Sequence, residues 1–178
     1  MKSKKVLIVI DMQQDFIDGA LRNRDAKAIV PNIVKKIEWW TGDIIMTMDT
    51  HGDNYLDTRE GRYLPVRHCI EGHDGWPLDE KVYYSLVSKF AAGFDISIIQ
   101  KDQFGHKDLW EVVRNYSEIE IVGICTDVCV VTNALLLRTF LPEMDITVDA
   151  SCCAGTTLEA HRAALTVMKS CHINIINN

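Results

Sequence analysis

Short runs of β-branched and other apolar residues alternate with helical patterns along almost the whole chain, and this alternation restricts the possible folds more than any other feature. Runs such as Lys5–Ile10 and Asp43–Met48 are apolar on both faces, which is typical of parallel strands covered by helices on each side. The pattern predicts a three-layer α/β/α sandwich of the Rossmann type, with a six-stranded, mostly parallel sheet. A chain of 178 residues without repeats or linkers is expected to form one domain over residues 1–178.

The expected elements can be assigned to residue ranges. The strands are Lys5–Ile10, Asp43–Met48, Ile96–Gln100, Glu118–Ile124, Asp145–Val148 and Ile173–Ile176. The helices are Pro31–Trp40, Leu78–Phe90, Lys107–Tyr116, Val128–Phe140 and Thr157–Cys171. Pro31 is expected in the first turn of its helix, where a missing N–H group leaves no hydrogen bond unmade. Asp149 is expected just beyond the end of the fifth strand.

The interval from His51 to Pro77 breaks this alternation. It contains four glycines, two prolines and many charged residues, with little periodicity. A loop of this length inside a compact domain is usually functional or disordered. Its three histidines, His51, His68 and His73, favour a functional loop.

Composition excludes several classes of function. The formal net charge of −6 argues against a nucleic-acid partner, which requires a basic surface. The apolar run Val6–Ile10 is too short for a signal-peptide core or a membrane span, so we expect a cytoplasmic protein without a membrane partner. Six cysteines at irregular spacings in such a chain indicate neither a disulfide framework nor a sulfur-ligated zinc site.

Polar residues follow the ends of the predicted strands. Asp11 follows the first strand, Asp49-Thr50-His51 the second and Lys101 the third. The fourth strand leads through Cys125-Thr126-Asp127 to Cys129. Ligands of open parallel sheets bind beyond the carboxyl ends of the strands, so we expect these side chains to share one site. A carboxylate, an ammonium, a thiol and an Asp-x-His pair at one edge favour a catalytic site over coincidence.

Cys129 has two interpretations. A free cysteine is a small apolar side chain, and most buried cysteines are inert. Alternatively, a helix N-terminus lowers the pKa of a thiol and makes it a nucleophile. The second interpretation is favoured if Asp11 is the general base and Lys101 the cation that keeps Asp11 ionised. The backbone N–H groups of Cys125 and Cys129, on a sharp strand-to-helix turn, are candidates for an oxyanion hole.

Asp49 and His51 flank Thr50, so in an extended segment both side chains point the same way. With a third donor they suit a divalent ion that keeps open positions for water or substrate, and His68 is the best candidate for that donor. Zinc suits this set of donors, and manganese or iron(II) also fits it. His73 is either a solvated loop residue or a group near the metal or the substrate. The remaining histidines are expected to have structural or surface roles: His106, His161 and His172.

Four segments of the chain resemble motifs of the isochorismatase-like cysteine hydrolases, the superfamily that contains the nicotinamidases. The segments are "VIDMQQDFIDGAL", "DTH", "LPVRHCIEGHDGW" and "GICTDVCVVTNA", and the resemblance extends over nearly the whole chain. It implies a catalytic triad of Asp11, Lys101 and Cys129 in an isochorismatase-like fold. The resemblance also implies the metal ligands Asp49, His51 and His68, a non-proline cis peptide bond just before Cys125, and Phe16 in the substrate pocket.

Two departures from the nicotinamidase pattern fall on the expected pocket walls. From Lys101 the chain reads "KDQFGHKDLW", where nicotinamidases usually follow the lysine with a Ser-Ala-Phe segment. Pro65-Val66-Arg67 precedes His68, where nicotinamidases tend to carry an aromatic residue. These departures concern the substrate rather than the class of chemistry. Cys129 argues against the vinyl-ether cleavage of isochorismatases proper, which typically lack this nucleophile.

The residues and the resemblance together predict a metal-assisted cysteine amidohydrolase. It is expected to release ammonia from a small amide through a thioester, with nicotinamide as the first expected substrate. Two alternatives stay open. One is hydrolysis of another small amide, such as a carbamoyl or ureido compound, and the other is a non-catalytic binding protein on the same fold.

The apolar character of two helices bears on assembly. Trp39-Trp40 ends the first predicted helix, and "ALLLRTF" at Ala134–Phe140 is apolar around nearly its whole circumference. A helix that is apolar all round must be covered on every side, either by neighbouring helices of the domain or by another chain. We expect a symmetric homo-oligomer, a dimer or a tetramer, which is also common in the family that the chain resembles.

Overall fold

The computed structural model describes residues 4–178 and contains a six-stranded sheet with the strand order β3-β2-β1-β4-β5-β6. Each neighbouring pair of strands is parallel. The strands are β1 (Lys5–Ile10), β2 (Asp43–Asp49), β3 (Ile96–Lys101), β4 (Glu118–Ile124), β5 (Asp145–Ala154) and β6 (Asn174–Ile176). The predicted α/β fold is confirmed, and its sheet is parallel throughout.

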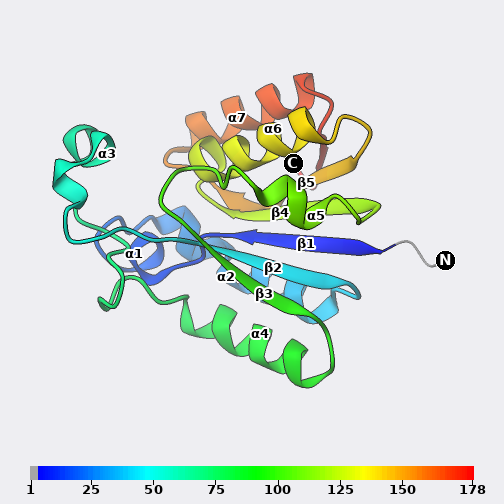
Figure 1. The fold of residues 1–178 in the computed structure, drawn as a ribbon, viewed down its shortest axis with the longest axis horizontal. Helices are drawn as coiled ribbons and strands as arrows, with labels where there is room; N and C mark the ends of the chain where they lie inside the picture. Colours follow the sequence, from blue (N-terminus) through cyan, green and yellow to red (C-terminus); the bar gives the residue numbers. More distant parts are fainter. Residues whose placement is uncertain (1–3) are drawn as a thin grey trace.

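Helices cover both faces of the sheet (Figure 1). One face carries α1 (Gln14–Ile17), α2 (Arg24–Trp39) and α4 (Glu80–Ala91), and the other carries α5 (Leu109–Val113), α6 (Val131–Phe140) and α7 (Leu158–Ser170). Successive side chains of a strand point to opposite faces, so the sheet separates two apolar cores. None of the helices within residues 4–178 has the length and apolar character needed to cross a lipid bilayer.

Helix α2 begins at Arg24 rather than at Pro31. The side-chain oxygen of Asn23 accepts hydrogen bonds from the N–H groups of Asp25 at 2.8 Å and Ala26 at 3.3 Å, which caps the helix at that point. The expectation that Pro31 lies in the first turn is therefore wrong, because this proline lies inside the helix. The start was missed because the first turn, Arg24 to Lys27, is mostly charged and shows no apolar periodicity.

Strand β5 runs further than predicted, from Asp145 to Ala154. Asp149 consequently lies within the strand, where its carboxylate pairs with the ammonium of Lys36 at 2.7 Å. The same ammonium pairs with Glu120 of β4 at 2.6 Å. Asp149 therefore helps to hold α2 against the sheet and lies away from the edge where the candidate site forms.

The irregular interval between β2 and α4 folds beyond the carboxyl ends of the strands (Figure 1). It contains the 3₁₀ turn η1 (Tyr55–Asp57) and the short helix α3 (Arg59–Tyr63). The buried amide of Gln13 anchors it, because Nε2 donates to the carbonyl oxygens of Asp49 and Trp76, each at 2.8 Å. Its Oε1 accepts a hydrogen bond from the N–H of Asp49 at 2.7 Å. An ordered loop therefore brings its histidines and charged residues to the sheet edge.

The helix that follows β4 is covered largely by its own chain. It starts with a π-helical turn, η2 (Thr126–Val130), and continues as α6. Ala134 and Leu137 of α6 are buried, and Trp110 of α5 stacks on Phe140 with ring centroids 5.2 Å apart. The apolar circumference of α6 therefore does not by itself require a second chain.

Candidate active site

Four adjacent strands bring the predicted residues to one edge of the sheet. Asp11 follows β1, Asp49 ends β2 and Lys101 ends β3, directly opposite Asp49 in the strand register. Cys129 lies in η2, which follows β4 on the other side of β1. All four side chains are buried. The strand order therefore assembles residues that are far apart in the sequence.

The ammonium of Lys101 lies at the centre of this group. Its Nζ is 2.7 Å from Asp11 Oδ2 and 3.1 Å from Asp49 Oδ1. The same nitrogen is 3.7 Å from Cys129 Sγ, within hydrogen-bonding distance of sulfur. Thr47 Oγ1 donates a hydrogen bond of 2.7 Å to Asp11 Oδ1, which fixes the second oxygen of that carboxylate. A carboxylate, an ammonium and a thiol thus form one connected cluster.

Burial dominates the protonation of the thiol. It raises the pKa of Cys129 well above the usual range, and the nearby Asp11 carboxylate raises it further, against the opposing effect of Lys101. Burial likewise raises the pKa of Asp11, again opposed by Lys101. The expectation that a helix N-terminus lowers the pKa of Cys129 is therefore wrong for this structure. The buried thiol therefore needs a base to become a nucleophile.

The turn that carries Cys129 is held from several sides. The carbonyl oxygen of Cys125 accepts hydrogen bonds from the N–H groups of Val128 at 3.1 Å and Val130 at 3.0 Å. The peptide bond between Ile124 and Cys125 is cis, as the resemblance implied. The two hydrogen bonds to the carbonyl oxygen of Cys125 hold the start of the turn.

The same turn also contacts helix α7 and Thr156, which precedes this helix. The hydroxyl of Thr126, which is fully buried, lies 2.8 Å from Nδ1 of His161. Asp127 accepts a hydrogen bond of 2.7 Å from the N–H of Thr156. His161 was expected to have a structural or surface role, and its contact with Thr126 gives it a structural one.

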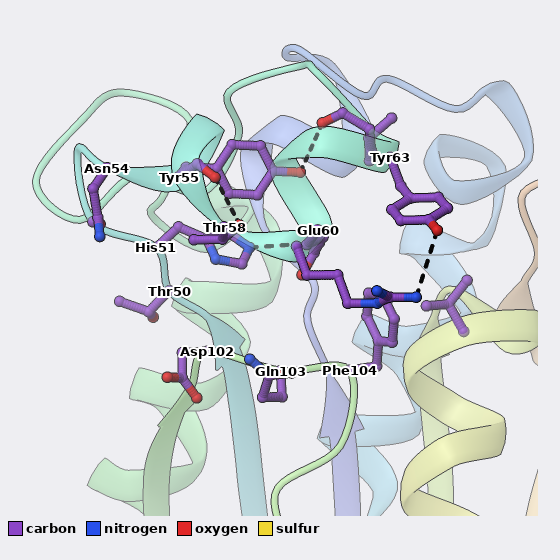
Figure 2. Close-up of a pocket in the computed structure, with 14 residues that line it drawn as sticks. Thr50, His51, Asn54, Tyr55, Thr58, Glu60, Tyr63, Asp102, Gln103 and Phe104 are labelled. Carbon is purple, nitrogen blue, oxygen red and sulfur yellow. Dashed lines mark hydrogen bonds and ion pairs between the residues drawn. The ribbon is translucent and has the colours of Figure 1, made fainter.

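A cluster of potential metal donors lies beside Asp49. One donor atom from each of Asp49, His51, Glu60 and His68 lies within 4.8 Å of all the others. His51 Nε2 is 2.9 Å and His68 Nε2 3.5 Å from Asp49 Oδ2. Glu60 Oε1 is 3.8 Å from His51 Nε2 (Figure 2) and 3.7 Å from His68 Nε2. Two imidazoles and two carboxylates converging on one point fit a divalent transition ion.

Charge within the cluster supports this interpretation. Burial acts to raise the pKa of Asp49, but hydrogen bonds from His51 and His68 outweigh it and hold the pKa well below its usual range. Burial and the Asp49 carboxylate raise the pKa of Glu60. His73 does not belong to the cluster, since it is exposed and its Nε2 lies 3.9 Å from Asp53.

Glu60 is the member that sequence reasoning missed. It lies in α3, in a charged stretch where no spacing pattern separates it from its neighbours. Thr58 caps this helix by accepting a hydrogen bond of 3.0 Å from the N–H of Gly61. Only this local fold turns Glu60 toward the histidines.

Two adjoining cavities give access to the cluster. One, of 440 Å³, is lined by Phe16, Cys125 and Cys129 and also touches His68. The ring of Phe16 meets that of His68 edge-on at 5.7 Å, which places Phe16 on the cavity wall as the resemblance implied. The other cavity, of 640 Å³, lies on the far side of Glu60 and is shown in Figure 2. The residues that line both cavities are Glu60, Leu64, Phe104 and Val128.

Several known proteins have chains similar to this one. The structure of nicotinamidase/pyrazinamidase PncA from Bacillus subtilis is 25% identical, covers 97% of this chain and 98% of its own, and has a TM-score of 0.83. The pyrazinamidase of Pyrococcus horikoshii in complex with zinc is 26% identical, with coverage of 98% and 99% and a TM-score of 0.73. A protein of Arabidopsis thaliana named a probable inactive nicotinamidase is 27% identical over 92% of this chain and 87% of its own.

The family assignment comes from a match to the isochorismatase domain. The family model matches residues 5–177, which includes every strand of the sheet and each of the candidate catalytic and metal-binding residues described above. This chain therefore belongs to the isochorismatase family.

Proposed function

We propose that this protein is a metal-assisted cysteine amidohydrolase that releases ammonia from a small amide, with nicotinamide as the first substrate to test. The observation that carries the proposal is the contact of one buried ammonium, that of Lys101, with Asp11 and Cys129. The related nicotinamidase/pyrazinamidase from B. subtilis and pyrazinamidase from P. horikoshii support the same class of reaction. The 440 Å³ cavity beside Cys129 has room for a small aromatic amide.

In this proposal Asp11 takes the proton of the Cys129 thiol as the thiolate attacks the amide carbonyl carbon. The backbone N–H groups of Cys125 and Cys129 stabilise the resulting oxyanion. Asp11 returns the proton to the amide nitrogen, the C–N bond breaks, and ammonia leaves a thioester on Cys129. Asp11 then takes a proton from water, whose oxygen attacks the thioester. As the C–S bond breaks and the carboxylic acid leaves, Asp11 returns that proton to the sulfur of Cys129, which restores the thiol. Lys101 keeps Asp11 oriented and favours its ionised form between these proton transfers.

The donor cluster would hold the metal ion through Asp49, His51 and His68, as expected from the sequence, with Glu60 as a fourth donor. When bound, the ion supplies a Lewis acid that orients a ring nitrogen of the substrate or a water molecule. Zinc is the first candidate, supported by the zinc complex of the P. horikoshii relative. Manganese and iron(II) fit the same donors.

Two alternatives follow from specific observations. Another small amide, such as a carbamoyl or ureido compound, would suit the same chemistry, and the unusual segment after Lys101 lies on the cavity wall. A non-catalytic binding protein is the alternative from another class. The A. thaliana relative, named a probable inactive nicotinamidase, supports loss of activity on this fold. An assay of ammonia release from a panel of small amides separates the three.

We also propose that the protein works in the cytoplasm. All six cysteines are free thiols, and three of them, Cys69, Cys125 and Cys129, lie beside the candidate site or within it. A reducing compartment preserves such thiols.

We also propose that the protein forms a homo-oligomer, and α4 offers a surface for it. Of the pair Trp39-Trp40 that the sequence suggested for this contact, Trp40 is buried within the chain, whereas Trp39 is 83% exposed and free to contact a second chain. On α4, however, four apolar or aromatic side chains are exposed in positions that share one side of the helix. They are Tyr83, Tyr84, Val87 and Phe90.

Replacement of Cys129 tests the covalent reaction. We expect Cys129→Ala to lower ammonia release from the best substrate by at least roughly 10³-fold, because the variant lacks the thiol that contacts Lys101. Circular dichroism and thermal melting should show a retained fold. Cys171→Ala, a change at a half-buried thiol at the end of α7, is the control and should keep wild-type turnover. Wild-type turnover by Cys129→Ala would exclude the mechanism.

Elemental analysis tests the metal site. Protein purified without chelator should contain about one transition ion per chain, as a single site implies. His51→Ala should lose most of it, and Glu60→Gln should bind the ion roughly tenfold or more weakly because a carboxylate donor becomes a neutral amide. His73→Ala, outside the cluster, should keep the wild-type content. Unchanged metal content in both His51→Ala and His68→Ala would remove the site from the account.

Light scattering tests the assembly. The wild type should have at least twice the chain mass of 20.2 kDa at micromolar concentration. The double variant Tyr84→Glu/Phe90→Glu should shift toward the monomer, since two charges would then lie in the proposed contact. Lys81→Glu, on the same helix, is the control. A monomeric wild type would refute the proposal.

A further inference from the structure

The segment 102–106, which joins Lys101 to the region of α5, forms a wall of the candidate site without belonging to a helix or strand. Phe104 lines both cavities and is 46% exposed, and Asp102 and Gln103 line the larger cavity (Figure 2). This is the segment in which the chain departs from the nicotinamidase pattern. Because the segment belongs to no helix or strand, another contact must hold Phe104 in place.

Asn133 supplies that contact. It lies in α6, four residues after Cys129, and its side chain is fully buried. Its Nδ2 donates to the carbonyl oxygen of Cys129 at 2.8 Å and to that of Phe104 at 3.2 Å. Its Oδ1 accepts a hydrogen bond of 3.0 Å from the N–H of His106. One amide group thus ties the backbone of the nucleophile to the backbone of the wall at two points.

The chemistry of the amide suits this task better than that of other side chains. Both N–H donors and the carbonyl acceptor of Asn133 are used, and a satisfied buried polar network is rigid and specific. An aspartate has no donor for the two carbonyl oxygens, and a threonine has only one. The three bonds therefore depend on this residue type.

Gly105 brings the same segment close to α6. A Cβ atom at this position would lie 2.7 Å from Leu136 Cδ1 and 2.7 Å from Thr132 Cγ2. A Cβ atom there would make these two side chains or the segment itself shift, so the segment rests directly on the helix. Asn133 and Gly105 act together to set how far Phe104 stands from Cys129.

We infer that Asn133 is a positioning residue that fixes the Phe104 wall relative to Cys129 and makes the site select flat aromatic amides over aliphatic ones. Phe104 and Phe16 both line the cavity that holds Cys129, and two aromatic side chains favour a planar ring between them. Release of Phe104 would open the boundary between the two cavities and remove this preference. The inference rests on the proposed amide hydrolysis.

The test is a double-mutant cycle on the ratio of kcat/KM for benzamide to kcat/KM for propanamide. Asn133→Ala and Phe104→Ala should each lower this ratio by roughly tenfold, and the double variant should lower it no further, because both changes act through one wall. Asn32→Ala is the matched control, since Asn32 also donates to a backbone carbonyl, that of Ser151, on the exposed side of α2. It should leave the ratio unchanged.

A merely structural role gives a different pattern. Asn133→Ala would then lower the melting temperature without changing the ratio, and the double variant would have the same ratio as Phe104→Ala alone. An unchanged ratio in Asn133→Ala would overturn the inference. Gly105→Ala provides a second route if Asn133→Ala fails to fold, because it displaces the wall from α6 while leaving Asn133 in place. It should lower the same ratio.

A measurement without substrate separates this inference from the proposed function. Iodoacetamide should alkylate Cys129 several-fold faster in Asn133→Ala than in the wild type, because release of the wall exposes the thiol, with Cys171 in the same sample as the reference. If the wild type hydrolyses no amide, the proposed function and the amide selectivity fail together, and this rate decides whether Asn133 positions the wall. An unchanged alkylation rate together with an unchanged ratio, or with no hydrolysis, refutes it.

Discussion

The buried ammonium of Lys101 is the contact on which the rest of the site depends. Burial acts to lower the pKa of Lys101, but Asp11, Cys129 and Asp49 together raise it, so the group stays charged. A buried charge is tolerated only when it is paired, and here the pairing needs the ends of β1, β2 and β3 together. The side chains of the site therefore lie side by side in the same order as the strands β3-β2-β1-β4 that carry them.

Asp49 connects the two halves of the site through its two oxygens. Oδ1 lies 3.1 Å from Lys101 Nζ, and Oδ2 lies 2.9 Å from His51 Nε2. The carboxylate that would bind the metal ion therefore also balances the charge of the lysine beside the nucleophile. In this account the metal site and the cysteine are one electrostatic unit, which explains why the proposed chemistry needs both.

The sequence allowed part of this site to be predicted, and the reason is topological. Parallel strands end at one edge, so Asp11, Asp49 and Lys101 could be grouped from strand ends alone. Glu60 and Asn133 could not, because the first depends on a short helix in an irregular loop and the second on a side chain that bonds a distant backbone. The start of α2 and the length of β5 were missed where polar residues lie inside regular elements, as at Asp149.

Ammonia release by a Lys101→Met variant tests the central claim most directly. Methionine keeps much of the length and volume of the side chain and removes its charge, so the contact with Asp11 and Cys129 is lost. The account predicts that turnover of the best amide falls by at least roughly 10²-fold, as for the loss of other oriented charges in active sites. Lys89→Met, which removes the ammonium of a buried lysine in α4 that donates to the carbonyl oxygen of Trp40, should leave turnover per folded molecule unchanged. Wild-type turnover by Lys101→Met would contradict the account.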